Sequence, residues 1–365
     1  MTVKQRILVA MSGGVDSSVA AARLLEEGYD VVGAFMRNGV QAVPERAHRQ
    51  GCCGIDDAQD ARRVADRLGV PFYALNFEDA FDELIEEFVG AYAEGRTPNP
   101  CIECNRRFKM GALTGLARRI GASAVATGHY AAVAERDGRH CITRGLDAGK
   151  DQSYVLFSLG QDALATTLLP LGGLTKSQVR DQARKLDLPV AEKPESMEIC
   201  FVPTGDYRDV VRERAPGALV PGPIIGPGDE VLGRHDGTAL FTIGQRRGLP
   251  GGQKEPLYVT HLDPGTATVR VGHRDDVLTS TFSATGVVFS GAAPAPAGTE
   301  LRGEVKIRSH HVPVPGTVTV RDDGRMDVVL DRPESAVTPG QAVVLYDGDA
   351  ILLGGWITRP AESEV

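Results

Sequence analysis

The sequence predicts a mixed α/β fold, with a parallel-sheet domain in the first part of the chain and a β-rich half after it. Strand-like and helix-like stretches alternate up to about residue 140. A glycine-rich turn, S-G-G-V-D-S at 12–17, joins the first strand to the first helix. Beyond about residue 206 short β-type runs dominate. Strands that alternate with helices indicate a parallel sheet covered on both faces, and regularly spaced short strands indicate a barrel or sandwich.

The elements of the first part follow from this alternation. We expect strands at 7–11, 29–36, 71–77 and 122–130, and helices at 17–28, 55–69, 79–95 and 108–121. Ligands of such sheets bind beyond the carboxyl ends of the strands. Because 12–17 and the Thr127-Gly128-His129 turn both follow strands, we expect them to line one crevice.

The second half begins with a stretch rich in Pro and Gly, 217–233. Its β-type runs are 258–263, 267–272, 282–290, 301–308, 316–321, 326–331, 341–346 and 351–357. We expect three units: a nucleotide-binding catalytic domain at 1–206, a central β-rich domain at 207–285 and a C-terminal β-barrel at 286–360. The A-P-A-P-A-G stretch at 293–298 is interpreted as a seam within this half.

The composition limits the classes of function. The formal net charge of −8 argues against a protein that coats nucleic acid through its overall field, although a local basic patch remains compatible with it. No apolar run approaches the roughly 20 residues of a membrane span, and the N-terminus has no signal-peptide pattern, so we expect a cytoplasmic protein without a membrane partner. The six cysteines include no second Cys or His pair at zinc-ligand spacing, so no firm metal site is predicted.

The 12–17 turn has the features of a phosphate-binding cup. A helix that starts there has amide N–H groups without internal partners, and Gly13 and Gly14 leave room for a ligand to approach them. The segment lacks the lysine of a mononucleotide P-loop, and its adjacent glycines do not match the dinucleotide fingerprint. The S-G-G-x-D-S pattern resembles the loop of ATP pyrophosphatases (the PP-loop superfamily), in which Asp16 could help to bind Mg²⁺.

Three cysteines suggest sulfur chemistry. Cys101 and Cys104 lie near the start of a predicted helix with Arg106, Arg107 and Lys109, a setting that favours thiolate. Either a half-buried pair on a solvated basic helix or a reactive pair fits this pattern. Cys200 is flanked by Ile199 and Phe201, as a buried cysteine would be. Combined with an ATP-splitting loop, the cysteines suggest that ATP activates an oxygen that a thiol-borne sulfur then displaces.

Several further blocks make a resemblance specific. They are T-P-N-P-C-x-x-C-N at 97–105, A-T-G-H-Y at 126–130, K-D-Q-S-Y at 150–154, I-C-F at 199–201, F-T-I-G-Q-R-R-G-L at 241–249 and T-P-G-Q at 338–341. In this order, and over nearly the whole chain, they resemble the tRNA-specific 2-thiouridylases. This family is ATP-dependent and replaces O2 of the wobble uridine in tRNA anticodons with sulfur.

The resemblance implies a role for individual residues. The ATP site would comprise Ala10, Met11, Ser12, Gly13, Gly14, Val15, Asp16, Ser17, Met36 and Gly128. Cys104 would be the catalytic nucleophile and Cys200 the persulfide carrier, and the two would form a transient disulfide. The target base and the anticodon stem-loop would contact Asn99, Pro100, Cys101, His129, Lys150, Asp151, Gln152, Arg308, Ser309 and Gln341. A sulfur-relay protein or a cysteine desulfurase would supply the sulfur.

Two positions depart from the family pattern. Cys101 stands where some members have an Asp, and Arg308-Ser309-His310-His311 replaces a pattern that often reads Arg-Tyr-Arg, which removes an aromatic stacking platform. Gln245-Arg246-Arg247 has the charge of an RNA phosphate contact, but an ordinary solvated surface run has the same composition.

Alternatives stay open at this point. Free hydrosulfide, rather than the persulfide, could attack the activated base. Cys101, Cys104 and Cys200 could ligate a [4Fe-4S] cluster with one open iron. An adenylating ligase or synthetase would use the same loop on a small substrate, and a non-catalytic RNA-binding module would use only the β-rich half.

Overall fold

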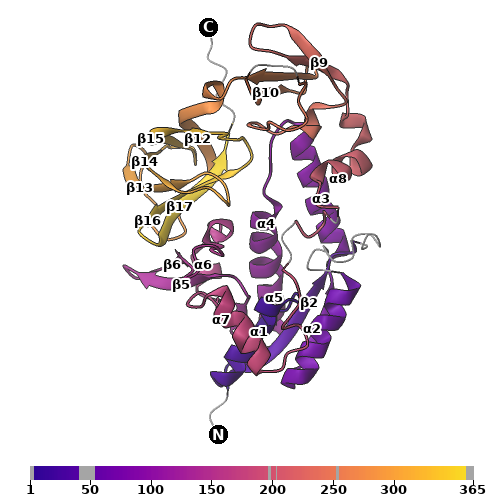
Figure 1. The fold of residues 1–365 in the computed structure, drawn as a ribbon. Coiled ribbons are helices and arrows are strands. Elements are labelled where there is room, and N and C mark those ends of the chain that lie inside the picture. The colour runs from indigo at the N-terminus through magenta and orange to yellow at the C-terminus, as the bar shows by residue number, and fades with distance from the viewer. Residues whose placement is uncertain (1–3, 41–53, 196–198, 203, 252–254, 359–365) are drawn as a thin grey trace.

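A computed structural model describes residues 4–40, 54–195, 199–202, 204–251 and 255–358 (Figure 1). Cys52 and Cys53 lie outside these residues. The chain forms three units, confirming the mixed α/β class: a parallel sheet with helices, a small central β unit and a β-barrel. No helix in the described part is long and apolar enough to cross a membrane.

The first unit is built on a five-stranded parallel sheet with the order β3-β2-β1-β4-β7. Its strands are β1 (Arg6–Ala10), β2 (Asp30–Arg37), β3 (Phe72–Asn76), β4 (Ala124–Ala126) and β7 (Thr167–Leu168). Six successive residues of β2 are buried, because helices cover both faces of the sheet.

The helices form two layers, each packed on alternate residues of β1. Helices α1 (Val15–Glu26), α2 (Ile55–Leu68) and α7 (Lys176–Lys185) cover Ile7 and Val9. The other layer covers Leu8 and contains α3 (Glu78–Ala93), α4 (Pro100–Glu103), the π-helix η2 (Cys104–Ala112) and α5 (Leu113–Arg119). The expected 108–121 helix is therefore the end of a continuous helical segment that starts at Pro100.

The central unit lies at the end of the molecule opposite α1 (Figure 1). It contains α8 (Tyr207–Arg214) and a sheet with the order β10-β11-β8-β9. The strands are β8 (Gly222–Ile225), β9 (Val231–His235), β10 (Tyr258–Asp263) and β11 (Thr268–Gly272). The Pro/Gly-rich stretch supplies β8 and β9, which the sequence did not reveal as strands.

The C-terminal unit is a closed barrel, since β12 pairs with both β15 and β17. Its strands are β12 (Leu278–Val288), β13 (Glu300–Lys306), β14 (Val314–Val320), β15 (Met326–Ser335), β16 (Ala342–Asp347) and β17 (Ala350–Ile357). A hairpin from the first unit, β5 (Ala131–Arg136) and β6 (Arg139–Arg144), extends this sheet through β6 and β17. Short helices complete the chain: η3 (Ser153–Leu156), α6 (Gln161–Leu164), η4 (Pro216–Ala218), η5 (Thr238–Leu240) and η6 (Asp275–Val277).

Strand β12 crosses the boundary expected between residues 285 and 286, and all of it belongs to the barrel sheet. We therefore propose that the third unit begins near Leu278. The 293–298 stretch joins β12 to β13 within one barrel, so its interpretation as a seam is wrong.

Candidate active site at the switch point of the sheet

The predicted crevice lies where the strand order of the parallel sheet reverses. The chain passes from β1 outward to β2 and β3 on one side, and then crosses back to β4 on the other side of β1. The turn that follows β4 meets the turn that follows β1: a Cβ atom on Gly128 would lie 2.7 Å from the backbone of Asp16 and Ser17. The two predicted motifs are thus in direct contact, at the position where open α/β sheets bind ligands.

The 12–17 turn has the backbone conformation that its sequence predicts. Gly13 has a φ of 71° and lies so close to α2 that a Cβ would be 2.1 Å from the Asp57 carbonyl oxygen. Gly14 is the N-cap of α1 without a side-chain cap, and the Ser17 hydroxyl accepts a hydrogen bond from Ser12 N at 3.0 Å. The first amides of α1 therefore face the crevice as donors for an anion.

Lys176, which the sequence analysis did not identify, approaches this turn from the start of α7. Its Nζ donates to both carboxylate oxygens of Asp16 at 2.7 and 2.8 Å. The Tyr130 hydroxyl also donates to Asp16, at 2.7 Å. Burial, followed by the charge of Asp16, raises the pKa of Tyr130 well above its usual value, so this hydroxyl stays protonated. Glu195 accepts from Lys150 at 2.6 Å and lies 3.3 Å from Lys176.

Lys193 is the second lysine that the sequence analysis missed. Its Nζ donates to the carbonyl oxygen of Gly13 at 3.0 Å and to Asp57 at 2.6 Å and Asp60 at 2.5 Å. Burial opposes its charge, but the two carboxylates outweigh this effect and raise the pKa of Lys193. Two ammonium groups therefore lie beside a turn whose amides already favour an anion.

The neighbouring candidates lie on the same edge of the sheet. Met36 is buried in β2. His129 is buried, and its Nδ1 lies 2.6 Å from the Thr127 hydroxyl. Burial, followed by the positive charge of Lys109, holds the pKa of His129 well below its usual range. Lys109 belongs to the cysteine-bearing helix, and Met110 of the same helix accepts a hydrogen bond from the Thr167 hydroxyl of β7 at 3.3 Å, so this helix packs along the parallel sheet.

The helical segment with the first two thiols begins as predicted. The Asn99 side chain caps α4 by accepting from Cys101 N at 3.2 Å. Cys101 is exposed, whereas Cys104 is half-buried against the core. The π-helix that starts at Cys104 is of a kind often found at functional sites. Arg106 and Arg107 supply less net positive charge near the thiols than the sequence suggests, because Arg106 pairs with Glu103 and Arg107 with Glu87.

Cys200 is half-buried, and both Cys200 and Cys104 pack against one hydrophobic cluster. Phe201, beside Cys200, contacts Phe88 of α3 edge-on, with ring centroids 5.1 Å apart. Cys141 is buried in β6.

Several predicted tRNA-contact residues make structural contacts. Asp151 accepts from Gly145 N and from both the amide and the hydroxyl of Ser153. The Gln152 side chain accepts from Tyr130 N at 3.0 Å.

The late T-P-G-Q block meets T-P-N-P-C, since Gln341 donates to the Thr97 carbonyl and Thr97 N donates to the Pro339 carbonyl, both at 2.8 Å. Arg308 donates to the Ser335 carbonyl, and Ser309 is partly exposed. Their roles toward RNA remain predictions.

The arrangement bears differently on the two metal hypotheses, the [4Fe-4S] cluster and Mg²⁺. No group of three His, Cys, Asp or Glu side chains among the described residues is arranged to hold a metal ion, so the three cysteines do not form a cluster site as placed here. Asp16 offers the oxygen chemistry that Mg²⁺ prefers, but both of its oxygens accept from Lys176. A Mg²⁺ ion that arrives with a nucleotide would therefore share Asp16 with Lys176 or displace it.

A parallel sheet with an S-G-G-x-D-S turn and two lysines at its switch point defines a nucleotide-binding protein of the PP-loop class. The family models that match are the tRNA methyl transferase HUP domain over residues 5–204, the tRNA methyl transferase PRC-barrel domain over 208–273 and the aminomethyltransferase β-barrel domain over 279–357.

Curated relatives named tRNA-specific 2-thiouridylase MnmA match nearly end to end. The protein from Geobacter metallireducens is 50% identical over 97% of this chain and 97% of its own, and that from Chloroflexus aggregans is 48% identical over 97% and 98%. The chain belongs to the tRNA-specific 2-thiouridylase family. Among solved structures, a 4-thiouridine synthetase–RNA complex with bound ATP aligns at 18% identity and a TM-score of 0.36, over 59% of this chain and 51% of that one, too distant for a functional comparison.

Proposed function

We propose that this chain uses ATP to replace O2 of the wobble uridine in tRNA anticodons with sulfur. Its end-to-end similarity to 2-thiouridylases supports this activity over a ligase or a non-catalytic RNA-binding module. The observation that carries the proposal is one shared hydrophobic cluster. Leu8 of β1, the strand that leads into the phosphate-binding turn, belongs to it, and Cys104 and Cys200 both pack against it. We expect the reaction in the cytoplasm.

In the first step, O2 of the uridine attacks the α-phosphorus of ATP, and pyrophosphate leaves. The amides of the first turn of α1 would hold the pyrophosphate, with Lys176 and Lys193 supplying positive charge as negative charge develops on it. Asp16 would hold Mg²⁺, which neutralises phosphate charge when bound. The product is a uridine whose O2 carries AMP.

In the second step, the terminal sulfur of a persulfide on Cys200 attacks C2 of the activated base. The C2–O2 bond breaks, and O2 leaves with AMP. The base is now joined to Cys200 by a disulfide. The Cys104 thiolate attacks Cys200 Sγ, which releases 2-thiouridine and leaves a Cys104–Cys200 disulfide.

The cycle then requires two external reactants. A thiol reductant must open the disulfide, and a sulfur-relay protein or a cysteine desulfurase must restore the persulfide on Cys200. The partial exposure of Cys200 is compatible with both exchanges.

Replacing Cys200 by Ser separates the two steps. The C200S variant should form AMP from ATP when given unmodified tRNA, but the tRNA should show no retardation on a mercury-containing gel. The C141A variant removes a buried thiol in β6 and should thiolate normally. Thiolated tRNA from C200S would remove the persulfide role and favour free hydrosulfide as the attacking species.

A further inference from the structure

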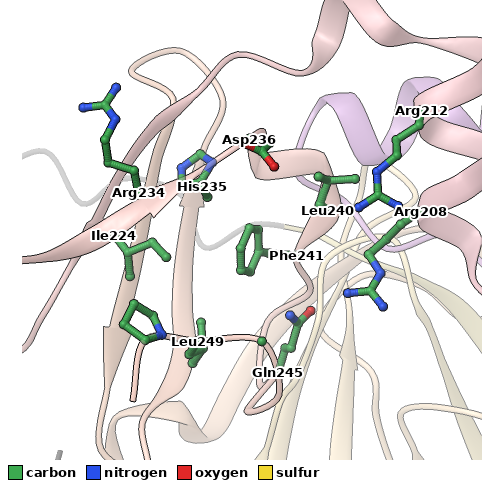
Figure 2. A pocket seen from close by; sticks show the side chains of 12 residues that line it. Arg208, Arg212, Ile224, Arg234, His235, Asp236, Leu240, Phe241, Gln245 and Leu249 are labelled. Carbon is green, nitrogen blue, oxygen red and sulfur yellow. The ribbon is translucent and has the colours of Figure 1, made fainter. Parts of the chain in front are cut away.

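The central unit contains a cavity of about 400 Å³ that the proposed reaction does not use. It lies between α8, strand β9 and the segment that follows η5 (Figure 2). Arg208 and Arg212 of α8 lie on one side of Phe241, and Arg234 of β9 lies on the other side, with its guanidinium directed away from the ring (Figure 2). This segment includes the F-T-I-G-Q-R-R-G-L block, for which the catalytic site gives no role.

The arginines differ in how far their charge is neutralised. Arg208 pairs with Asp206, and Arg212 pairs with Asp209. By contrast, Arg234 has no carboxylate partner among the described residues, and neither do Arg246 and Arg247, which lie between the lining residues Gln245 and Gly248 but do not themselves line the cavity. Asp236 also lines the cavity and offsets part of this charge. Three arginines in one cavity wall, one of them without a carboxylate partner, in a protein of net charge −8 make this cavity suitable for an anion.

His235 provides a second, independent feature of the cavity wall. The residue is 6% exposed, and Nε2 lies 3.1 Å from the Ala267 carbonyl oxygen, which requires Nε2 to carry the proton. Burial lowers the pKa of His235, so the ring stays neutral and Nδ1 is a hydrogen-bond acceptor. No described group donates to Nδ1. Such an orphaned acceptor requires a donor from a ligand or a bound water.

The wall between these groups is apolar and held in place. Phe241, Leu240 and Leu249 line it, and Phe241 packs edge-on against His235 with centroids 5.5 Å apart. The Gln245 side chain fixes the loop, since it accepts from Thr242 N and donates to the Arg247 carbonyl.

We infer that this cavity binds a ribonucleotide of the tRNA, at a site separate from the modified uridine. A nucleotide offers a phosphate for Arg234 and its neighbours, a base face for Phe241, and a 2′-hydroxyl or base amine to donate to His235 Nδ1. Because Nδ1 is shielded from solvent, the ligand reaches it through a small rearrangement of the cavity wall. The inference rests on the proposed function in taking tRNA as the ligand.

Equilibrium binding of unmodified tRNA, without ATP and over a range of salt concentrations, tests the phosphate contact. R234Q should weaken binding 3- to 10-fold, about the effect of one lost charged contact, and should reduce the slope of log K against log salt by about 0.7 to 0.9. R274Q is the matched control, because Arg274 is another exposed arginine of the central unit that lies outside the cavity. It should leave the affinity within 2-fold of the wild-type value.

H235Q tests the donor contact, because a glutamine amide can still donate to the Ala267 carbonyl but has no acceptor where Nδ1 was. It should bind tRNA several-fold more weakly while keeping the wild-type melting temperature to within a few degrees. Wild-type affinity and salt slope in both R234Q and H235Q would overturn the inference. Wild-type tRNA binding with lost sulfur delivery from a donor protein would also overturn it, and would indicate an acidic protein partner instead.

The two proposals fail separately. At saturating tRNA, R234Q should form AMP at the wild-type rate, because the cavity is remote from the phosphate-binding turn. Suppose that tRNA binding by the wild-type chain depends on salt, Arg234 and His235 as expected, but that the chain neither forms AMP nor thiolates the tRNA. The proposed function would then fail and the ribonucleotide site would stand.

Discussion

At the scale of single residues, the charges around the phosphate-binding turn are already paired. Lys176, 160 residues after Asp16 in the chain, donates to its carboxylate, and Lys193 donates to the Gly13 carbonyl from 180 residues away. Asp57 and Asp60 raise the pKa of Lys193, although burial opposes its charge. We expect the pyrophosphate part of ATP to compete with these protein oxygens for both lysines.

Replacing Lys176 by Met should reduce kcat/KM for ATP about 100-fold, the usual effect of removing one charged group that stabilises a transition state. K176R should recover part of this loss, because it keeps the charge. Steady-state AMP formation with varied ATP measures both. K185M, at the exposed end of the same helix, is the control, and equal losses in K185M and K176M would contradict a specific role for Lys176.

His129 should make the folded protein sensitive to acid. Its pKa is held below the unfolded value of about 6.5, so as the pH falls below 6.5 the unfolded chain takes up a proton that the folded protein does not. Between pH 6.5 and 5.5 this lowers the free energy of unfolding by about 1 kcal/mol. Urea titrations at pH 6.5 and 5.5 measure this loss, and the H129Q variant should lose about 1 kcal/mol less of its free energy of unfolding than the wild-type chain. An equal loss in both proteins would contradict a neutral His129 in the folded protein.

At the scale of elements, the turn after β4 fits against the start of α1 only because residue 128 has no side chain. We expect G128A to push these two elements apart, since the added methyl group would meet backbone atoms rather than a flexible side chain. This should cost about 1–3 kcal/mol of stability and weaken ATP binding at least 10-fold.

Thermal unfolding and equilibrium nucleotide binding measure these two effects. G115A, in α5, is the control: a Cβ there meets nothing within 4 Å, and alanine favours a helix by up to about 1 kcal/mol. Normal ATP binding by G128A would show that the contact does not shape the site.

The sequence predicted the features of the fold that depend only on residues close together in the chain. The alternation of strands and helices, the Gly13-Gly14 turn and the start of the cysteine helix at Pro100 all follow from neighbouring residues. Pairings between distant segments were not predictable in the same way. Lys176 and Lys193 lie in segments with ordinary helix and loop patterns, and the carboxylates that neutralise Arg107 come from another helix. The pairing of hairpin β5–β6 with the barrel sheet was not predictable, because its partner strand, β17, lies more than 200 residues away.

At the scale of the whole molecule, the barrel is fastened to the first unit by buried polar contacts. Lys306 Nζ lies 3.6 Å from Asp151, and their side chains are 9% and 8% exposed. The Tyr154 hydroxyl donates to the Ala342 carbonyl at 2.9 Å, and the Arg144 guanidinium lies over the Tyr346 ring. Burial lowers the pKa of Lys306, an effect that Asp151 partly offsets. We therefore expect the first unit and the barrel to unfold together.

Asp151→Asn should destabilise this interface. It leaves the Lys306 charge without its partner and weakens the bonds to Ser153, which should cost about 3 kcal/mol. Urea denaturation measures the loss. K150Q, at the neighbouring and more exposed position, is expected to cost less than about 1 kcal/mol. Full stability in D151N together with weaker tRNA binding would assign Asp151 to RNA contact instead.

The hairpin β5–β6 also constrains how such proteins can evolve. Residues 131–144 are encoded with the catalytic unit but lie in the barrel sheet, where Thr143 pairs with Ala350. A recombination event that exchanged the C-terminal part alone between two lineages would divide one sheet between two ancestries. Functional chimeras should therefore be those that inherit the hairpin and the barrel from the same parent.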